Sequence, residues 1–421
     1  VKEPARQRFP VHRLNGAEVS RIDACLSSQL FDRQTAPFPL PAEDLTEGLH
    51  AYRRLLGGMI QHLPDSAPPP LEGPGSVSVI VVNWNRRDLL LACLRSLALQ
   101  QDVPFEVILV DNGSTDGSAE AVQSESWPFP LRLIRNRENR GFCAANNQGI
   151  AASRAEFIAL LNNDAEAEPG FLYHLRRAFD KGPRVGMAAA KILVWEDPRI
   201  IDKAGHLIWP DGQNRGRGAG ELDQGQYDEE QEALWPDGCA CMYRRAMLQE
   251  LGGFDEDLFA YGDDADLGLR ARIAGWTCWL MPQAGVRHHR GSTLGLASSA
   301  RLTLIERNRV LLAVKLFPGT LLWLNVAYHL ARLLAGAKAA LLNRGEISRF
   351  SSPMDKLRAA AAILRGQWQA LWMLPRTWRK RQAFGPLRRL SPRQVRQLLR
   401  QYRIPLRTLS EQAIPPPPPR R

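Results

Sequence analysis

The sequence predicts an α/β fold in which helices flank a mostly parallel sheet. Between residues 77 and 165, short β-branched apolar runs alternate with segments that have the apolar spacing of helices, an order typical of parallel sheets. Polar or acidic residues follow several of these runs directly. Residues 301–409 are basic and rich in Leu, Ala and Trp, which indicates an added helical region.

The alternation defines the predicted elements of the sheet domain. They are, in order, a strand at 77–83, a helix at 88–100, a strand at 105–111, a strand at 131–134, a helix at 141–153 and a strand at 157–161. Parallel neighbours need crossover connections, which the helices supply. We therefore expect a parallel half-sheet between about 77 and 165.

Composition divides the 421 residues into five parts. Residues 1–63 carry short helical patterns and form an accessory segment. The Pro- and Gly-rich residues 64–75 cannot hold regular structure and are expected to be a linker. The α/β domain then spans 76–300, a basic amphipathic helical region spans 301–409, and 410–421 form a disordered Pro-rich tail.

The positive charge of the chain is concentrated near its end. Residues 301–421 contain 24 Lys and Arg but only 4 Asp and Glu, an excess larger than the net charge of +11 of the whole chain. The longest uncharged stretch there, residues 316–331, is shorter than the roughly 20 residues of a spanning helix. We expect amphipathic helices with Trp323, Trp368, Trp372 and Trp378 to lie on an anionic membrane surface.

Two other interpretations of this basic region remain open. One is a helical tail packed on the body of the protein, with solvated charges. The other is nucleic-acid binding, which we do not expect because no recognisable binding module accompanies the charge. The sequence shows no secretory signal, so we expect a cytoplasmic protein that is peripheral on the inner face of the cell membrane.

Ligands of parallel sheets bind beyond the carboxyl ends of the strands. Asn83 and Asn85 close the first predicted strand, and Asp111 closes the second, where its carboxylate is suited to a base or ribose. The next helix opens with small residues around Gly141 and Asn146, which would let a phosphate approach backbone N–H groups. A bare turn at Asp111 and plain packing of the small residues are the alternatives.

Two acidic segments suggest the chemistry. Asp164 follows a predicted strand, and Asp263, Asp264 and Asp266 cluster a hundred residues later. A strand-end carboxylate suits Mg²⁺ or Mn²⁺, which neutralises a departing diphosphate. Crowding by like charges raises the pKa of a carboxyl group, which suits a base that deprotonates an acceptor hydroxyl. The alternative is a solvated helix start, because acidic residues also favour first turns.

The chain also carries a set of characteristic blocks at residues 79–85, 111–118, 139–142, 161–164, 252–256 and 263–267. Together, and at this spacing, they resemble family 2 glycosyltransferases of the GT-A fold, in particular the rhamnosyltransferase-like branch. The resemblance covers residues 77–293, roughly half of the chain. It implies a Rossmann-like sheet and a single in-line displacement that inverts the anomeric centre of the sugar.

The resemblance assigns roles to the strand-end residues. It implies that Asn83, Asn85 and Asp111 hold the nucleoside of a sugar nucleotide. It implies that Asp164 binds the divalent cation on the diphosphate. Asp264 would be the catalytic base, with Asp263 as its main rival.

Two positions depart from the family pattern. Asn162 stands where many relatives have a first metal-binding Asp, and Asp263 stands where they have Glu. Asn162 supplies no negative charge, so the cation needs a further ligand. His288, in a block that resembles the family's strand-end histidines, is our candidate, and a phosphate contact or a structural role is the alternative.

Other residues are assigned to the acceptor side. The segment with Trp235 and Asp237 resembles the one that precedes the Gly-Gly-Phe-Asp block of the family, and we group Asp266 with them. Core packing is the alternative for Trp235. The Gly-rich residues 212–220 are predicted to form neither helix nor strand. They would be a lid whose arginines reach phosphate or acceptor, or else a loose connection.

These observations predict an inverting, metal-dependent glycosyltransferase. Its partners would be a nucleotide-diphosphate sugar, carrying rhamnose or another hexose, and a glycan or lipid-linked glycan acceptor in cell-surface polysaccharide synthesis. The alternatives are a catalytically silent GT-A module that binds nucleotide or glycan, and a nucleotidyltransferase. The latter lacks support because no Gly-rich basic phosphate loop follows the first strand.

Overall fold

The structure is a computed structural model that describes residues 71–290, 298–350 and 352–413. The accessory segment predicted at 1–63, most of the linker predicted at 64–75 and nearly all of the Pro-rich tail lie outside these residues. The α/β domain and the basic helical region can therefore be compared directly with their predictions.

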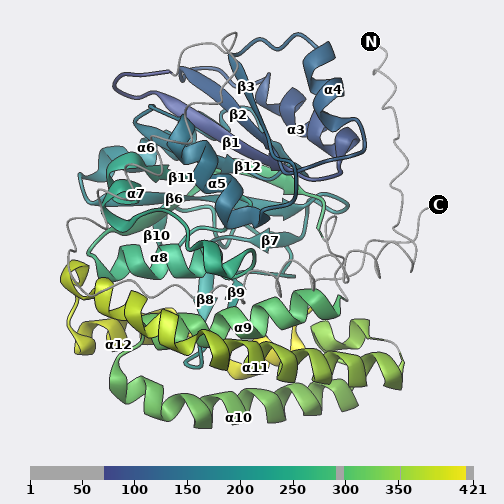
Figure 1. Cartoon of the computed structure of the whole chain (residues 1–421), viewed down its shortest axis with the longest axis vertical. Coiled ribbons are helices and arrows are strands. Elements are labelled where there is room, and N and C mark those ends of the chain that lie inside the picture. The colour runs from purple at the N-terminus through teal and green to yellow at the C-terminus, as the bar shows by residue number, and fades with distance from the viewer. Residues whose placement is uncertain (1–70, 291–297, 351, 414–421) are drawn as a thin grey trace.

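A ten-stranded mixed sheet forms the centre of the described chain (Figure 1). Its main path runs β10-β12-β6-β11-β4-β1-β2-β3, with β5 paired to β12 and β7 to β6. The strands are β1 (Val77–Asn83), β2 (Phe105–Asp111), β3 (Leu131–Arg135), β4 (Phe157–Leu161), β5 (Ala165–Ala167), β6 (Val185–Val194), β7 (Ile201–Lys203), β10 (Gln231–Ala233), β11 (Ala240–Arg244) and β12 (Thr277–His288).

The predicted half-sheet is confirmed. β1 pairs in parallel with both β2 and β4, and β2 pairs in parallel with β3. The crossover helices are α3 (Arg87–Leu97), α4 (Ser118–Ser124) and α5 (Gly141–Ala152), of which α4 is not among the helices predicted above. The antiparallel strand β11, between β4 and β6, makes the sheet mostly rather than wholly parallel.

Alternate residues of the central strands build two separate cores. Val77, Val79 and Val81 of β1 pack with α3, α4 and α6 (Phe171–Arg177) on one face of the sheet. Ile80 packs on the other face with α5, α7 (Arg245–Leu251) and α8 (Asp263–Ile273). Side chains of a strand point to opposite faces in turn, so a strand buried on both faces must be apolar throughout. The result is a three-layer α/β/α domain.

The basic region forms helices that lie beside the sheet domain at the bottom of Figure 1. Helix α9 is next to α8, α11 packs along α9, and α10 is outermost in this view. These helices are α9 (Ser299–Leu316), α10 (Gly319–Leu341), α11 (Pro353–Ala383), α12 (Pro392–Gln401) and α13 (Leu406–Glu411). No helix in the described part of the chain combines the length and the apolar character needed to cross a bilayer.

Ion pairs dock the basic helices on the acidic sheet domain. Lys315 of α9 places its Nζ 2.6 Å from an oxygen of Asp255 and 2.9 Å from one of Asp266. Lys380 of α11 contacts the same Asp255, and Arg376 lies 2.8 Å from Asp257. The prediction of one membrane-surface region over 301–409 is therefore wrong for α9, whose polar residues 306–309 are buried against the domain. Much of the charge asymmetry of the sequence serves contact between the two regions.

The Gly-rich segment 212–220 also differs from its prediction. It contains strand β9 (Asn214–Gly216), which pairs antiparallel with β8 (His206–Ile208) in a small separate hairpin. Arg215 and Arg217 donate hydrogen bonds to the carbonyl oxygens of Ala219 and Ala204. The backbone pairing of β8 with β9 and the hydrogen bonds that these arginines donate hold the segment in place. The arginines are therefore engaged within the protein and do not form the expected lid.

Candidate active site

The first three nucleotide-site residues meet at the carboxyl edge of the sheet. Asn83 and Asp111 are paired in register at the ends of β1 and β2, and the Asn83 amide donates to Asp111 Oδ1 at 3.2 Å. Asn85 Oδ1 accepts from the backbone N–H of Thr115 at 2.7 Å. Asn163, which the sequence did not single out, donates to Asn83 Oδ1 at 2.7 Å. The parallel register therefore gathers these polar groups as predicted.

Gly141 and Asn146 lie differently from their prediction. The Gly141 N–H donates to Asn139 Oδ1 at 2.9 Å, and Asn146 is buried and donates to the Phe142 carbonyl within α5. A Cβ on Gly141 would lie 2.5 Å from the ring of Phe259, and its φ of +84° disfavours other residues. The glycine therefore permits close packing inside the protein. The Gly141 N–H and the Asn146 side chain both form hydrogen bonds within the protein, so the prediction that they bind phosphate is not supported.

Asp164 and His288 form the first half of the candidate catalytic centre. Strand β5 pairs antiparallel with β12 and places His288 opposite Ala165, the residue after Asp164. His288 Nε2 lies 3.4 Å from Asp164 Oδ1, while its Nδ1 lies 2.8 Å from Asp202 Oδ2. Burial opposes ionisation of Asp202, but Lys203, His288 and Arg290 outweigh it and hold its pKa well below the usual range. His289 stacks on Trp195 instead.

This arrangement fits a divalent cation. A carboxylate that holds one nitrogen of a histidine fixes the tautomer, so the other nitrogen presents its lone pair. Asp202 does this for His288 and thereby directs Nε2 toward Asp164, which gives an oxygen and a nitrogen ligand side by side. Among the described residues, the Asn162 side chain makes no hydrogen bond, although its backbone N–H donates to the Cys239 carbonyl. Its amide oxygen is therefore not committed elsewhere.

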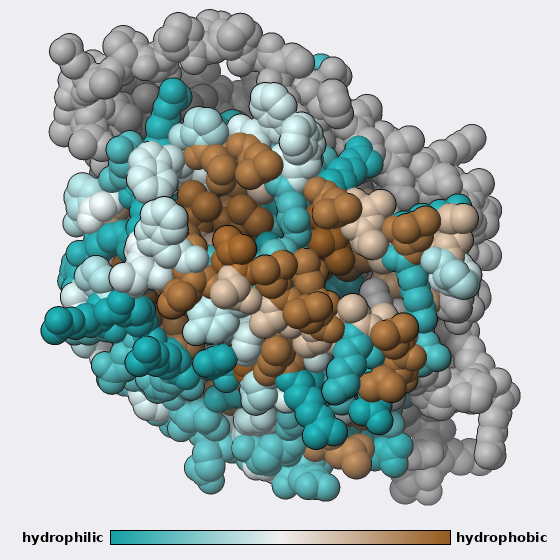
Figure 2. Space-filling view, turned by 90° about the horizontal axis from the view of Figure 1, so that it is seen from below, coloured by the Kyte–Doolittle hydropathy of each residue, from teal (hydrophilic) through white to brown (hydrophobic). Residues whose placement is uncertain are grey.

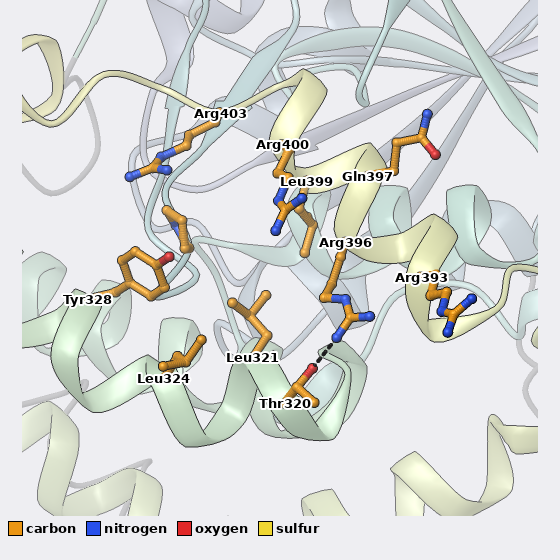
Figure 3. A pocket seen from close by; sticks show the side chains of 11 residues that line it. Thr320, Leu321, Leu324, Tyr328, Arg393, Arg396, Gln397, Leu399, Arg400 and Arg403 are labelled. Carbon is orange, nitrogen blue, oxygen red and sulfur yellow. Dashed lines mark hydrogen bonds between the residues drawn. The ribbon is translucent and has the colours of Figure 1, made fainter.

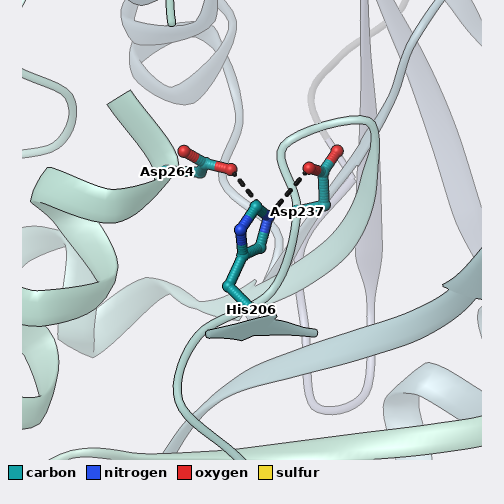
Figure 4. Close-up of side chains that lie close together, drawn as sticks. All are labelled: His206, Asp237 and Asp264. Carbon is teal, nitrogen blue, oxygen red and sulfur yellow. Dashed lines mark hydrogen bonds and ion pairs between the residues drawn. The ribbon is translucent and has the colours of Figure 1, made fainter. Parts of the chain in front are cut away.

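The second half of the centre consists of His206, Asp237 and Asp264 (Figure 4). His206 Nε2 lies 2.9 Å from Asp237 Oδ2 and 3.2 Å from Asp264 Oδ2, and all three residues are buried. The other oxygen of Asp264 accepts from the N–H of Ala265 at 2.7 Å. A lone histidine in a short strand gives no sequence signal, so His206 was missed.

The three residues could by spacing hold a metal ion, because their ligand atoms lie within 4.8 Å of one another. Lys203, however, places its Nζ 2.7 Å from Asp237 Oδ2. A divalent cation here would lie close to that ammonium group, and like charges at this range repel. We therefore interpret this cluster as a charge network that orients Asp264, and the metal site as the one around Asp164.

The short strand β7 joins the two halves. Its consecutive residues Asp202 and Lys203 contact His288 and Asp237 respectively. β4 and β11 are antiparallel, so Asp164 after β4 lies near the segment of Asp237 before β11. Contacts thus run without interruption from Asp164 through β7 to Asp264, although these residues are far apart in sequence.

Asp263 differs from its neighbour Asp264 in its surroundings. Burial, and then the adjacent Asp264 carboxylate, raise the pKa of Asp263 above its ordinary value. Asp264, in contrast, contacts His206, and 12% of its side-chain surface stays exposed at the start of α8. The raised pKa favours the neutral form of Asp263.

Two residues assigned to the acceptor side are structural. Trp235 is fully buried, and Gly268 allows it to pack on α8, since a Cβ there would lie 2.2 Å from the Trp235 Cβ. The Trp235 ring stacks beside His206 with centroids 5.9 Å apart. Asp266 is buried in ion pairs with Arg270 and Lys315. Both predictions are corrected, because Trp235 fills the core under His206 and Asp266 faces the α9 side of its helix.

His206 gives the site a testable pH dependence. Burial alone would lower its pKa, but Asp264 and Asp237 outweigh it and raise the pKa from 6.5 to about 9. This stabilisation is complete below the unfolded pKa of 6.5 and is lost as the pH rises through about 9. We expect wild type to lose on the order of 3 kcal/mol relative to His206→Gln over that range. Paired denaturant titrations at pH 6 to 10 measure it, and parallel pH profiles would contradict the assignment.

The fold and the site suit a transferase, because Asn83 and Asp111, the pair of Asp164 and His288, and Asp264 at the start of α8 are linked by contacts at one edge of the sheet. Residues 78–252 match the model of glycosyl transferase family 2. The expected resemblance is confirmed for these residues, which carry a family 2 glycosyltransferase domain. The match ends before Asp264 and His288, so their place in the centre comes from the structure.

Two relatives extend the comparison. The chain is 29% identical over 248 residues to an N-acetylglucosaminyl-diphospho-decaprenol L-rhamnosyltransferase of Mycobacterium tuberculosis, covering 53% of this chain and 79% of the relative. It is 31% identical over 238 residues to the O-antigen biosynthesis protein RfbC of Myxococcus xanthus, covering 53% of this chain and 18% of the relative.

A solved structure confirms the fold. The GalNAc-T7 structure with UDP, GalNAc and Mn²⁺ superposes with a TM-score of 0.51 at 14% sequence identity, covering 82% of this chain and 68% of that one. The GT-A fold predicted from the sequence blocks is therefore confirmed.

Proposed function

We propose that this protein is an inverting, metal-dependent glycosyltransferase. It moves rhamnose or another hexose from a nucleotide-diphosphate sugar to a glycan or lipid-linked glycan acceptor in cell-surface polysaccharide synthesis. The observation that carries the proposal is the continuous side-chain network from Asp164 to Asp264 at the carboxyl edge of the sheet. The rhamnosyltransferase and O-antigen relatives support the class of donor and pathway.

Each residue has a defined task in this mechanism. Asn83, Asn85 and Asp111 bind the nucleoside, and Asp164, Asn162 and His288 would hold Mg²⁺ or Mn²⁺. That cation, when bound, supplies positive charge against the departing diphosphate. Asp264 accepts the proton of the attacking acceptor hydroxyl, while His206 and Lys203 keep its surroundings neutral and oriented. Asp237 contributes by fixing His206 and Lys203 at the acceptor side.

Turnover tests this proposal directly. Purified protein would be incubated with dTDP-rhamnose, UDP-hexoses, UDP-galactofuranose or GDP-mannose, a synthetic lipid-linked sugar and Mn²⁺ or Mg²⁺. We expect one donor to give a glycosylated product that disappears with EDTA and returns with the metal. If EDTA leaves product formation unchanged, the proposed metal dependence is wrong. If no donor gives a product, the proposed class of donor is wrong.

The proposed partner of the C-terminal helices is the inner surface of the cell membrane. Viewed from below, the molecule shows a broad apolar area bordered by hydrophilic side chains (Figure 2). Large apolar residues of α10 and α11 are exposed, including Trp323, Leu334, Leu364, Trp368 and Trp372. Soluble proteins rarely leave so many large apolar side chains together in water. Exposed basic residues on the same helices, such as Lys338 and Arg365, suit anionic lipid.

Vesicle binding tests the apolar face. Deleting α9 to α13 would remove part of the buried core, so point variants are needed. We expect Trp323→Gln combined with Trp372→Gln to weaken binding to phosphatidylglycerol vesicles roughly thirtyfold, because two large apolar side chains no longer enter the lipid. Flotation assays measure the effect. Leu99→Gln, an equally polar change at an exposed residue beside α3, is the control and should bind as wild type.

If the double variant floats with vesicles as wild type does, this face is not the membrane contact. Thermal unfolding of each variant shows whether the change left the fold intact.

A further inference from the structure

A separate pocket lies between the helices of the C-terminal region (Figure 3). It has a volume of about 480 Å³ and is formed by α10 and α12 together with Pro210 from the turn after β8. This size is typical of sites for small molecules. None of the residues assigned above to nucleotide, metal or proton transfer lines it.

One wall of the pocket is strongly basic. Arg393, Arg396 and Arg400 recur at spacings of three and four residues and so share one face of α12, and Arg403 follows the end of this helix. Arg396 and Arg400 project from α12 toward α10 (Figure 3). Arg396 donates to Thr320 Oγ1 at 2.7 Å, and Arg403 lies over the rings of Trp209 and Tyr328.

These four arginines lack acidic partners in the part of the chain that the structure describes. Within the described ranges, none of them forms an ion pair with a carboxylate, and no acidic residue lines the pocket. This contrasts with Lys315, Arg376 and Lys380, which the sheet domain neutralises. Like charges on one helix face repel each other. A group of guanidinium ions without counter-charges is therefore suited to an external anion, and phosphate matches the planar fork of arginine.

The opposite wall is apolar. Leu321 and Leu324 of α10 face the arginines, with Leu399 of α12 behind them (Figure 3). Leu324 is 54% exposed, so this wall reaches the surface of α10. The exposed Trp323 precedes it by one residue and lies about 100° away around the same helix. A ligand that bridges both walls must join an anionic group to an apolar chain.

We propose that this pocket binds the phosphate headgroup of an anionic membrane lipid. The phosphate lies against Arg396 and Arg400, and the acyl chains lie along Leu324 toward the apolar face of α10. The proposal rests on the membrane contact for the source of the lipid, but it adds a discrete site to that contact. Binding there fixes how the glycosyltransferase domain stands on the membrane, because α12 also supports β8: the Ile208 N–H donates to the Tyr402 carbonyl.

A charge-preserving double variant, Arg396→Lys with Arg400→Lys, tests the site. Lysine retains the positive charge but loses the two-pronged hydrogen bond of arginine to phosphate. We expect its affinity for vesicles of phosphatidylcholine with 30% phosphatidylglycerol to fall about tenfold. The matched control is Arg358→Lys with Arg365→Lys on exposed residues of α11, which should bind within about twofold of wild type.

The outcomes separate this lipid site from the two earlier proposals, which are the membrane contact and the glycosyltransferase activity. If both lysine pairs bind as wild type, membrane attachment stands but needs only diffuse charge, and the discrete site is overturned. A second outcome would be that neither wild type nor the double variant of Trp323 and Trp372 binds vesicles. If inorganic phosphate then protects wild type from thermal unfolding, but does not protect Arg396→Lys with Arg400→Lys, the pocket binds free phosphate. The proposal of a lipid is then overturned. Transfer of sugar to a water-soluble acceptor, measured in parallel, reports on the catalytic centre. Its rate should be equal in wild type, in the double variant of Trp323 and Trp372, and in the two lysine double variants.

Discussion

Replacing Asp264 by Asn is expected to lower kcat by about 10²- to 10⁴-fold, because the acceptor hydroxyl loses the group that takes its proton. Asn has nearly the same size and preserves an oxygen that can accept from the N–H of Ala265. The proposed donor site lies around Asn83 and Asp111, so the donor-induced thermal shift should be unchanged. Initial rates at saturating donor and acceptor measure the effect.

Asp263→Asn is the matched control for the base. Burial and Asp264 raise the pKa of Asp263, so it holds a proton that Asn imitates in shape and polarity. We expect this variant to lose far less activity than Asp264→Asn. The reverse order of activities would make Asp263 the base, and equal losses would mean that the pair acts as one unit.

Replacing Asp164 by Asn is expected to abolish the metal-dependent part of donor binding. A nucleotide sugar at about 100 times its dissociation constant should stabilise the wild type by roughly 2.7 kcal/mol in the presence of Mn²⁺. Asp164 is the one carboxylate among the three residues assigned to the cation, so without it Mn²⁺ should no longer increase the shift. A thermal-shift panel with and without Mn²⁺, on both proteins, measures this difference.

Asp202→Asn refines the same experiment. Asp202 contacts His288 rather than the proposed cation, so its loss should weaken metal affinity by about 10- to 100-fold without abolishing it.

A shift in Asp164→Asn that still grows with Mn²⁺ would exclude Asp164 as a ligand. The cluster of His206, Asp237 and Asp264 would then be the next candidate for the cation, despite Lys203.

The local pattern of the sequence was sufficient for the half-sheet. Runs such as residues 77–83 are β-branched and apolar, and residues 88–100 have helical spacing, so each segment favours one structure before any packing occurs. The strand ends followed from topology, because parallel strands bring their carboxyl ends to one edge. Asn83, Asp111 and Asp164 were predicted as site residues for that reason.

The errors arose where one-dimensional spacing is ambiguous. Asp263, Asp264 and Asp266 form one acidic cluster in sequence, but a helix turns about 100° per residue and sends Asp266 to Lys315. Trp235 was a candidate for sugar contact because an aromatic ring suits both a sugar and a core. The Gly-rich segment 212–220 lacks strand-forming residues, yet it pairs with β8 through its backbone.

The sequence by itself determined the class of fold, the order of the half-sheet strands and the acidic residues suited to metal and proton chemistry. Each of these depends on local pattern or on a motif of a few residues. Only the tertiary structure decided that Asp202 and His206 contact His288 and Asp264. It also decided that the basic helices dock partly on the sheet domain and that, among the described residues, the arginines of α12 have no acidic partner. These depend on which distant side chains become neighbours, and that is set by strand pairing and packing across the whole chain.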